Sequence, residues 1–239
     1  MKDTEWIKHF PELNALVGCA QEPEWHPEGD VWTHTLQCMD AFAETRTGDE
    51  LEDIIVGLAV LCHDLGKPAT TAFSDGRIRS LGHEEAGDAP TRSFLARMTN
   101  QDDLVESVVP LVAHHLKPQE LYRAKAGDSA IRRLARKVKR IDRLVRIVKA
   151  DQMGRFPMVC GDFPEGDWLL ASARRLDVQD SVPRPLVLGR HLIQLGLTPG
   201  PIFGGILDEC YEAQLDGAFN NSEDGVAYAT KVIMRRHQE

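Results

Sequence analysis

One apolar segment constrains the fold of this chain more than any other feature. Residues 51–65 are apolar on nearly every side of a helix, and this pattern predicts a central, buried helix. Gly66, Lys67 and Pro68 follow the segment. We expect them to end the helix, because glycine caps helices and proline cannot continue them.

The remaining patterns predict further helices, so we expect an all-α architecture. Residues 33–44, 84–98 and 103–116 look helical, and residues 129–154 predict a long amphipathic helix or a helix pair, with apolar side chains at helical spacing. Residues 70–82 are loop-like, with a Ser-Asp-Gly turn and room for a short hairpin.

The composition shifts near residue 155. The stretch 154–167 is rich in Gly and Pro and predicts a linker or an irregular crossover. A second helical region follows from Trp168 to the end. We therefore expect one domain over residues 1–155 and a C-terminal helical extension over residues 156–239, which 239 residues with 42% hydrophobic content can support.

Charge, cysteines and hydropathy limit the classes of function. The net charge of −9 argues against general affinity for nucleic acid, which needs clustered Lys and Arg. The five cysteines form no Cys-x-x-Cys pair, which favours a reducing compartment. The longest apolar run, 54–62, is far shorter than the roughly 20 residues of a membrane span. We expect a cytoplasmic protein with no membrane contact.

An imidazole and a carboxylate stand side by side at the end of the apolar segment. Burying His63 and Asp64 is costly unless something satisfies them, and a divalent cation would do so. His34, one helix upstream, and Asp151, at the end of the long helix, are further candidate ligands. Two imidazoles and two carboxylates suit Mn, Fe, Co, Ni, Zn or Mg, and the residue types do not choose among these metals.

His34, then His63-Asp64, then Asp151 on successive helices resembles the H…HD…D signature of the HD superfamily. The resemblance implies an HD-type helical bundle over residues 1–155, in which these residues hold a catalytic metal. It also implies a metal-dependent phosphohydrolase, a phosphatase or phosphodiesterase, in which water activated by the metal is the nucleophile.

Further histidines indicate a second site, so we expect one or two metal ions. In two-metal HD enzymes, histidines at the places of His83 and of His114 or His115 bind a second ion, and the motif Asp, here Asp64, bridges the two. His115 continues the apolar face of its helix and is the favoured ligand, with His114 in reserve. Their alternative is a hydrogen-bonded histidine near the core.

Three residues are expected on the substrate side. Lys67 and Arg155 are cations next to the ligand positions, where they would hold phosphate oxygens and, with Asp64, serve catalysis. His26 either lines the mouth of the substrate site or packs within its loop.

A closer similarity covers most of residues 20–220. Residues 23–35, Gly82-His83 and 150–155 resemble the HD region of bacterial multifunctional CCA-adding tRNA nucleotidyltransferases, and residues 196–217 resemble the part that follows it. The Gly-Gly-x-Val-Arg-Asp and Asp-x-Asp motifs of the nucleotidyltransferase head are not found in the sequence. Nucleotide addition is therefore not expected of this chain, and the resemblance implies a phosphatase and 2′,3′-cyclic phosphodiesterase.

Three functions stay open at this stage. The first is hydrolysis of nucleotide-type phosphoesters, 2′,3′-cyclic phosphates or RNA 3′ ends. The second is a non-catalytic accessory module that binds tRNA or another RNA; the basic run 132–149 would supply its surface, although a solvated helix face is the default for such a run. The third is a mononucleotide 5′-nucleotidase. The oligomeric state is not predicted.

Overall fold

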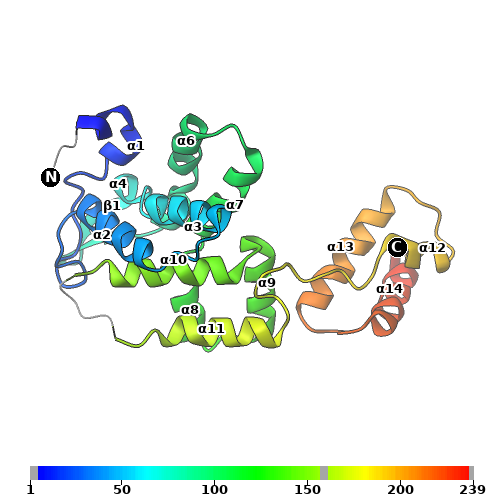
Figure 1. Ribbon diagram of the computed structural model, residues 1–239. Helices are drawn as coiled ribbons and strands as arrows, with labels where there is room; N and C mark the ends of the chain where they lie inside the picture. Colours follow the sequence, from blue (N-terminus) through cyan, green and yellow to red (C-terminus); the bar gives the residue numbers. More distant parts are fainter. Residues whose placement is uncertain (1–4, 157–160, 237–239) are drawn as a thin grey trace.

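The computed structural model describes residues 5–156 and 161–236 and is mostly helical, as the sequence predicts (Figure 1). The first part contains η1 (Glu5–His9), α1 (Pro11–Asn14), α2 (Val31–Glu44), α3 (Glu50–Cys62), α4 (Lys67–Thr70), β1 (Thr71–Ser74), β2 (Arg77–Ser80), α5 (His83–Ala86), α6 (Asp88–Met98) and α7 (Asp102–Val112). The second part contains α8 (Lys117–Arg123), α9 (Asp128–Val138), α10 (Ile141–Met153), α11 (Pro164–Arg175), α12 (Gly189–Gln194), α13 (Ile202–Leu215) and α14 (Ser222–Arg236).

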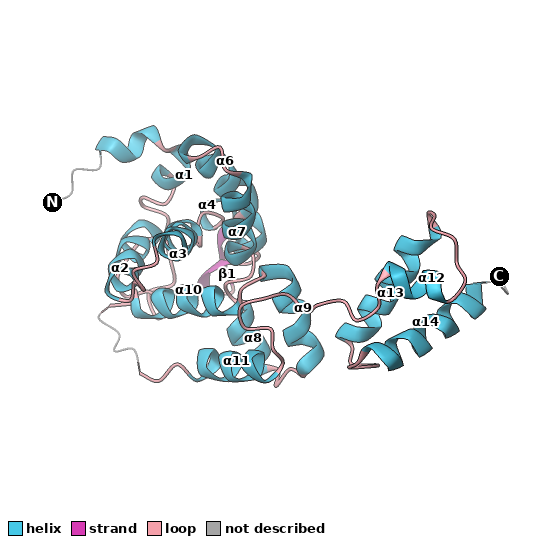
Figure 2. Ribbon diagram, turned by 45° about the vertical axis from the view of Figure 1, so that its right-hand side comes forward, coloured by secondary structure: helices cyan, strands magenta, loops and turns pink. Residues whose placement is uncertain are grey.

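The apolar segment forms α3, which packs against α2, α7 and α10 (Figure 2). Its inner residues, among them Val56, Ala59 and Val60, are fully or almost fully buried in the hydrophobic core. Burial is not complete, because Leu51 and Ile54 near its first turn are exposed. The prediction of a central helix is thus confirmed for most of the segment.

The α-helix ends at Cys62, three residues before the predicted end at Leu65. The next residues form turns, in which the Leu65 amide donates to the Cys62 carbonyl (3.1 Å) and the Lys67 amide donates to the Asp64 carbonyl (3.0 Å). Lys67 and Pro68 then begin the short helix α4, where proline is tolerated because its missing N–H would have no partner in the first turn. His63 and Asp64 therefore lie on a turn between two helices.

A short hairpin follows, at the place where the sequence leaves room for one. Strands β1 and β2 are antiparallel, and Phe73 lies opposite Ile78. Asp75 and Gly76 connect them with positive φ angles of 53° and 75°, the geometry of a two-residue type I′ turn. The amide of Ile78 donates to Glu22 Oε2 (2.9 Å), which fixes the hairpin against the loop before α2.

The long amphipathic pattern over residues 129–154 corresponds to a helix pair, α9 and α10. The chain bends at Lys139, whose φ of 62° lies in the left-handed region and cannot continue a right-handed helix. Helix α10 packs against α2, α3 and α11 and carries Asp151 in its last turn.

Helix α11 begins at Pro164, inside the stretch predicted as a linker, while residues 157–160 of that stretch lie outside the described part of the chain. Leu169 and Ala173 of α11 belong to the large hydrophobic cluster that also contains residues of α2, α3, α7 and α10. A separate, smaller cluster lies among α12, α13 and α14 and consists of Val187, Leu192, Ile206, Cys210, Phe219, Ala229 and Val232. The domain boundary at residue 155 stays a prediction.

Ion pairs connect α9 to α13 in the C-terminal part. Arg133 contacts Glu212 (3.1 Å) and Asp216 (2.5 Å), and Arg136 contacts Glu212 and stacks over the Tyr211 ring. Much of the basic run thus pairs with carboxylates of the same chain, since other members of it contact acidic residues of α3: Arg140 and Arg143 contact Glu52, and Arg146 contacts Asp53.

None of the helices within the described ranges is both long enough and apolar enough to cross a membrane.

Candidate metal centre

Three separate elements bring the four motif residues together. His34 lies in the first turn of α2, which starts at Asp30 because the Asp30 side chain accepts a hydrogen bond from the Thr33 amide (2.9 Å). His63 and Asp64 come from the turn after α3, and Asp151 comes from the end of α10. All four are buried.

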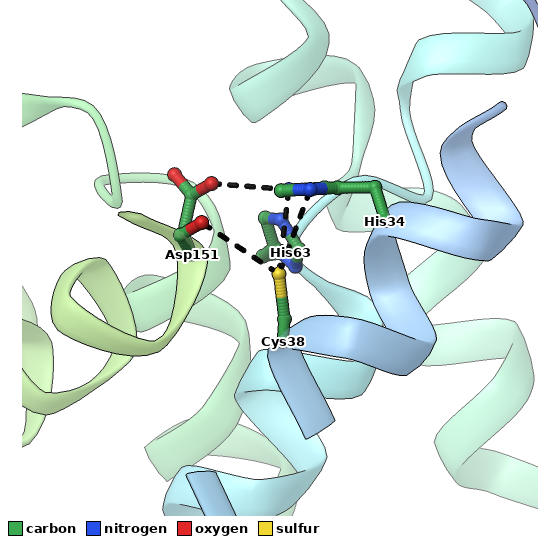
Figure 3. Close-up of side chains that lie close together, drawn as sticks. All are labelled: His34, Cys38, His63 and Asp151. Carbon is green, nitrogen blue, oxygen red and sulfur yellow. Dashed lines mark hydrogen bonds and ion pairs between the residues drawn. The ribbon is translucent and has the colours of Figure 1, made fainter. Parts of the chain in front are cut away.

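These residues form the first group of candidate ligands. Nε2 of His34 lies 3.0 Å from Asp151 Oδ1 and 3.9 Å from Asp64 Oδ2, and Nε2 of His63 lies 3.2 Å from Asp64 Oδ2. Figure 3 shows the side chains of His34, His63 and Asp151 converging from their helices, together with Cys38. Among the described residues, the cluster whose possible ligand atoms all lie within 4.8 Å of one another contains His34, Cys38, His63 and Asp151, and Asp64 adjoins it through Oδ2. The structure thus brings the four residues of the H…HD…D pattern close together.

A second group contains His83 and His115, which share Asp64 with the first group. The two Nε2 atoms are 3.2 Å apart, and Nε2 of His83 lies 3.4 Å from Asp64 Oδ1. Asp64 therefore turns Oδ2 toward the first group and Oδ1 toward the second. One carboxylate oxygen for each group is the arrangement that a bridging ligand requires.

The four imidazoles of the two groups have the same orientation. Nδ1 of His63, His83 and His115 donates to the backbone carbonyls of Val60, Ser80 and Val112, each at 2.7 Å. Nδ1 of His34 donates to Glu28 Oε1, also at 2.7 Å. With Nδ1 acting as the donor, each neutral ring has its lone pair on Nε2, and each Nε2 faces the centre.

The Nε2 nitrogens and carboxylate oxygens at the centre of both groups are atoms that can bind a cation. Nε2 of His63 is buried and has no hydrogen-bond partner within the described part of the chain. In the second group, two Nε2 lone pairs face each other at 3.2 Å. Buried acceptors facing one another are unfavourable without a positive charge between them. Imidazole nitrogens together with carboxylate oxygens suit a divalent transition metal or Mg²⁺.

Electrostatics keeps the ligand carboxylates ionised. Burial would raise the pKa of Asp64, but the charges of His63 and Lys67 hold this pKa well below its usual range. The pKa of Asp151 is likewise lowered, against the effect of burial, by Arg155 and His34. Both carboxylates therefore stay negatively charged and able to bind a cation at neutral pH.

The pKa values of His115 and His34 shift in opposite directions. Burial lowers the pKa of His115 to about 3, so this ring is neutral at pH 7. Burial acts in the same direction on His34, but hydrogen bonds with Asp151, Cys38 and Glu28 raise the pKa of His34 well above its usual range.

Two cations lie beside the ligand carboxylates. Nζ of Lys67 is 2.8 Å from Asp64 Oδ2 and donates to Gln21 Oε1 (2.6 Å), and Nη2 of Arg155 donates to Asp151 Oδ1 (3.2 Å). Both side chains line a cavity of about 570 Å³ that also contains His26, His83 and parts of the hairpin. This volume falls within the range of small-molecule sites.

The predicted substrate-side residues therefore share one cavity with the candidate ligands Asp64, His83, His115 and Asp151. His26 lies on the cavity wall, and its Nδ1 donates to Glu28 Oε1 (2.8 Å). A larger cavity of about 850 Å³ lies between α2 and α3, and none of the candidate ligands lines it.

His114 does not join either group of candidate ligands among the described residues. Its Nδ1 donates to the Pro110 carbonyl (2.9 Å), whereas His115 points into the second group. The turn after α7 separates the two neighbours, because successive residues of a turn face different directions.

Sequence reasoning missed three residues at this centre: Gln21, Glu28 and Cys38. Sγ of Cys38 lies 3.3 Å from Nε2 of His34, and its position one turn after His34 on α2 is a signal that the sequence does contain. Glu28 and Gln21 lie in the irregular segment before α2, where no periodicity indicates the direction of a side chain.

A helical bundle with buried His and Asp residues on a turn and at two helix ends is the arrangement of an HD domain. The HD domain family matches this chain over residues 31–147, and the chain therefore carries an HD domain. No solved structure matches the chain.

The chain is also distantly related to the HD region of multifunctional CCA proteins. It is 29% identical over 188 residues to the "Multifunctional CCA protein" of Acinetobacter baumannii (strain AYE), covering 75% of this chain and 44% of the relative. The proteins of that name from Halorhodospira halophila (strain DSM 244 / SL1) and Xylella fastidiosa (strain M12) are 32% and 31% identical, covering 68% and 72% of this chain and 39% and 42% of the relatives. The chain thus spans less than half the length of these relatives.

Proposed function

We propose that this protein is a metal-dependent phosphohydrolase that acts on nucleotide-type phosphoesters, as a 2′,3′-cyclic phosphodiesterase and phosphatase. The observation that carries the proposal is the position of Asp64. Its two oxygens face two groups of inward-pointing imidazoles, at a cavity that also contains Lys67 and Arg155. Cation ligands and cationic side chains at one cavity suit an anionic substrate.

The residues divide into two roles. His34, His63, Asp64 and Asp151 would hold one divalent ion, and His83 and His115, with the second oxygen of Asp64, would hold another. When bound, such ions supply Lewis acidity, which activates water near neutral pH and offsets the charge of the phosphoryl group.

The chain's own cations would orient the substrate. Lys67 and Arg155 neutralise Asp64 and Asp151, and their remaining N–H groups can donate to phosphate oxygens, Arg155 through two parallel hydrogen bonds. Gln21 holds Lys67 in place by accepting from its Nζ. His26 presents its Nε2 to the cavity, because Nδ1 is held by Glu28.

The nature of the substrate is inferred from the relatives. They are multifunctional CCA proteins, and this relation supports a tRNA-related context and a phosphate at a nucleotide or an RNA 3′ end. A cavity of about 570 Å³ is large enough for a nucleotide.

The decisive experiment measures phosphate release by metal-stripped protein after addition of Mn²⁺, Co²⁺, Ni²⁺, Mg²⁺, Fe²⁺ or Zn²⁺. Substrates are an aryl phosphate, 2′,3′-cyclic AMP and 5′-mononucleotides. We expect metal-dependent turnover that Asp64→Asn reduces by at least about 10³-fold, since both groups lose a charged ligand. Asp177→Asn, on an exposed turn at the end of α11, is the matched control and should keep full activity.

The preferred substrate separates a cyclic phosphodiesterase from a mononucleotide 5′-nucleotidase. Protein that binds metal and hydrolyses none of these substrates would contradict the proposed activity.

A non-catalytic RNA-binding module is the second candidate, favoured by the relation to CCA proteins. Much of the basic run that would form its surface pairs with carboxylates of the same chain. Under this alternative, tRNA binding measured by filter retention persists in Asp64→Asn, and no hydrolysis is seen with the unaltered chain.

A further inference from the structure

Glu28 is a buried carboxylate in the irregular segment that precedes α2. Its side chain is 0% exposed, and Oε1 accepts hydrogen bonds from Nδ1 of His34 (2.7 Å) and from Nδ1 of His26 (2.8 Å). A buried carboxylate is costly unless it has such partners.

The group that accepts the hydrogen bond from Nδ1 is different for His34 than for the other three imidazoles. Nδ1 of His63, His83 and His115 donates to neutral backbone carbonyls, whereas Nδ1 of His34 donates to a carboxylate. A carboxylate behind an imidazole fixes the orientation of the ring and makes its other nitrogen a stronger metal ligand. Glu84 Oε2 lies 3.6 Å from Nδ1 of His83, beyond hydrogen-bond distance. Among these four imidazoles, that of His34 is therefore the one whose Nδ1 is hydrogen-bonded to a carboxylate.

The charges around the two groups are also unequal. Oxygens of Asp64 and Asp151 lie within 3.9 Å of the Nε2 atoms of the first group, and Glu28 stands behind His34. Among the described residues, the second group includes one carboxylate, Asp64, and Nδ1 of each of its imidazoles is hydrogen-bonded to a neutral carbonyl. The second group should therefore bind a divalent cation less strongly than the first.

Glu28 does not itself have the geometry of a ligand. His26, Glu28 and His34 lie close enough to be considered as a third group. Their nitrogen and oxygen atoms are hydrogen-bonded at 2.7 and 2.8 Å, whereas ligand atoms around a tetrahedral ion stand about 3.4 Å apart, given metal–nitrogen bonds of about 2.1 Å. The other ring nitrogen of His34 faces Asp151.

We propose that Glu28 is a positioning residue, which acts through His34 to make the first group the tight metal site, so that two ions bind in a fixed order. The first group fills first, and the second group fills at higher metal concentration. The inference shares with the proposed function the assumption that both groups hold metal, but it does not depend on the substrate.

The test is calorimetric titration of Mn²⁺ into the metal-stripped protein of residues 1–239. The unaltered chain should show a tight and a weak class of site. Glu28→Gln preserves the shape and an acceptor oxygen but removes the charge, and it should weaken the tight class by about 10–100-fold. The weak class should keep its affinity. Unchanged affinity of the tight class in Glu28→Gln would overturn the inference.

Two further variants make the result specific. Glu24→Gln makes the same chemical change in the same segment, at a side chain that is exposed and paired with Arg77, and both classes should keep their affinity. If Glu28→Gln does not fold by circular dichroism, Glu28→Asp, which keeps the charge but shortens its reach, takes its place. The tight class must then weaken while the weak class stays unchanged.

The inference and the proposed function fail in different ways. Two classes of metal site with the expected response to Glu28→Gln, but no hydrolysis, would contradict the proposed function and support the inference. Metal-dependent hydrolysis, with metal affinities that are the same in Glu28→Gln as in the unaltered chain, would support the function and overturn the inference.

Discussion

Glu52, in the first turn of α3, is held by two arginines that follow it by about 90 residues in the chain. Nε and Nη2 of Arg143 donate to its two oxygens at 2.8 and 2.5 Å, and Nη1 of Arg140 donates at 3.2 Å. The hydrogen bonds from Arg143 lower the pKa of Glu52 against a smaller effect of burial. This one carboxylate fixes the start of α3 to α10.

We expect Glu52→Gln to lower the free energy of unfolding by about 1 kcal/mol at pH 7, the upper end for a partly exposed ion pair with two-point geometry. Because the pKa in the folded state lies below the value of about 4.3 in the unfolded chain, the stabilisation is present above that pH and is lost as the pH falls through the folded pKa.

Urea unfolding of both proteins at pH 7 and at pH 3 measures this difference. Glu50→Gln, which removes a charge from an exposed position in the same turn, controls for the helix dipole and should change stability less. An equal effect of Glu52→Gln at both pH values would contradict the argument.

At the scale of elements, glycines determine how closely the segments that carry the ligands approach one another. A Cβ on Gly66 would lie 2.0 Å from the His83 carbonyl oxygen and 2.6 Å from the Gly87 amide nitrogen. A Cβ on Gly154 would lie 2.3 Å from Sγ of Cys38 and 2.8 Å from its amide nitrogen. The first contact brings α5 to the turn that carries Asp64, and the second brings α10 to α2.

Gly66→Ala should therefore displace α5 and His83 from Asp64. We expect a loss of about 1–3 kcal/mol in the free energy of unfolding from overpacking, and a weaker second metal site with the first largely preserved. Thermal unfolding and the calorimetric Mn²⁺ titration measure both effects. Gly127→Ala, where a Cβ meets nothing within 4 Å, is the control, and equal results for the two variants would refute the role of close packing.

The whole molecule has two hydrophobic clusters, the larger around α3 and the smaller among α12, α13 and α14. The two are joined by the connection after α11 (Figure 1). Exposed ion pairs of α9 with α13 also join them, and such pairs contribute little to stability. We propose that the C-terminal extension unfolds separately from the HD domain.

Leu192, fully buried in the smaller cluster, tests this separation. Leu192→Ala should destabilise the extension by about 2–5 kcal/mol while metal affinity at the HD domain stays unchanged. Differential scanning calorimetry should show one transition shifted and another preserved. Leu144→Ala, in the larger cluster, should shift the other transition, and a single transition shifted by both variants would show that the molecule unfolds as one unit.

Several features followed from local patterns in the sequence. The helical periodicity of residues 129–154 and the apolar run 51–65 predict helices because each turn of a helix presents the same face to the core. The turn at Asp75-Gly76 follows from residues that tolerate positive φ. The all-α fold and the HD domain are confirmed.

Other features needed the tertiary structure. Whether the basic run 132–149 faces solvent depends on carboxylates such as Glu52 and Glu212, which are distant in sequence. The start of α11 at Pro164 is set by its packing on α8 and α10, against a Gly- and Pro-rich composition that favours a linker. Long-range contacts of this kind leave no periodic trace in the sequence.

By itself, the sequence determined the helical architecture and the residue types of the candidate centre, because periodicity and burial cost are properties of short segments. The tertiary structure decided which atoms meet. It alone shows which oxygen of Asp64 faces each group of imidazoles, turns every Nε2 of these groups inward by tying Nδ1 to an oxygen, and places the carboxylate of Glu28 behind His34. The physical reason is that hydrogen-bond direction depends on the distance and angle between segments far apart in the chain.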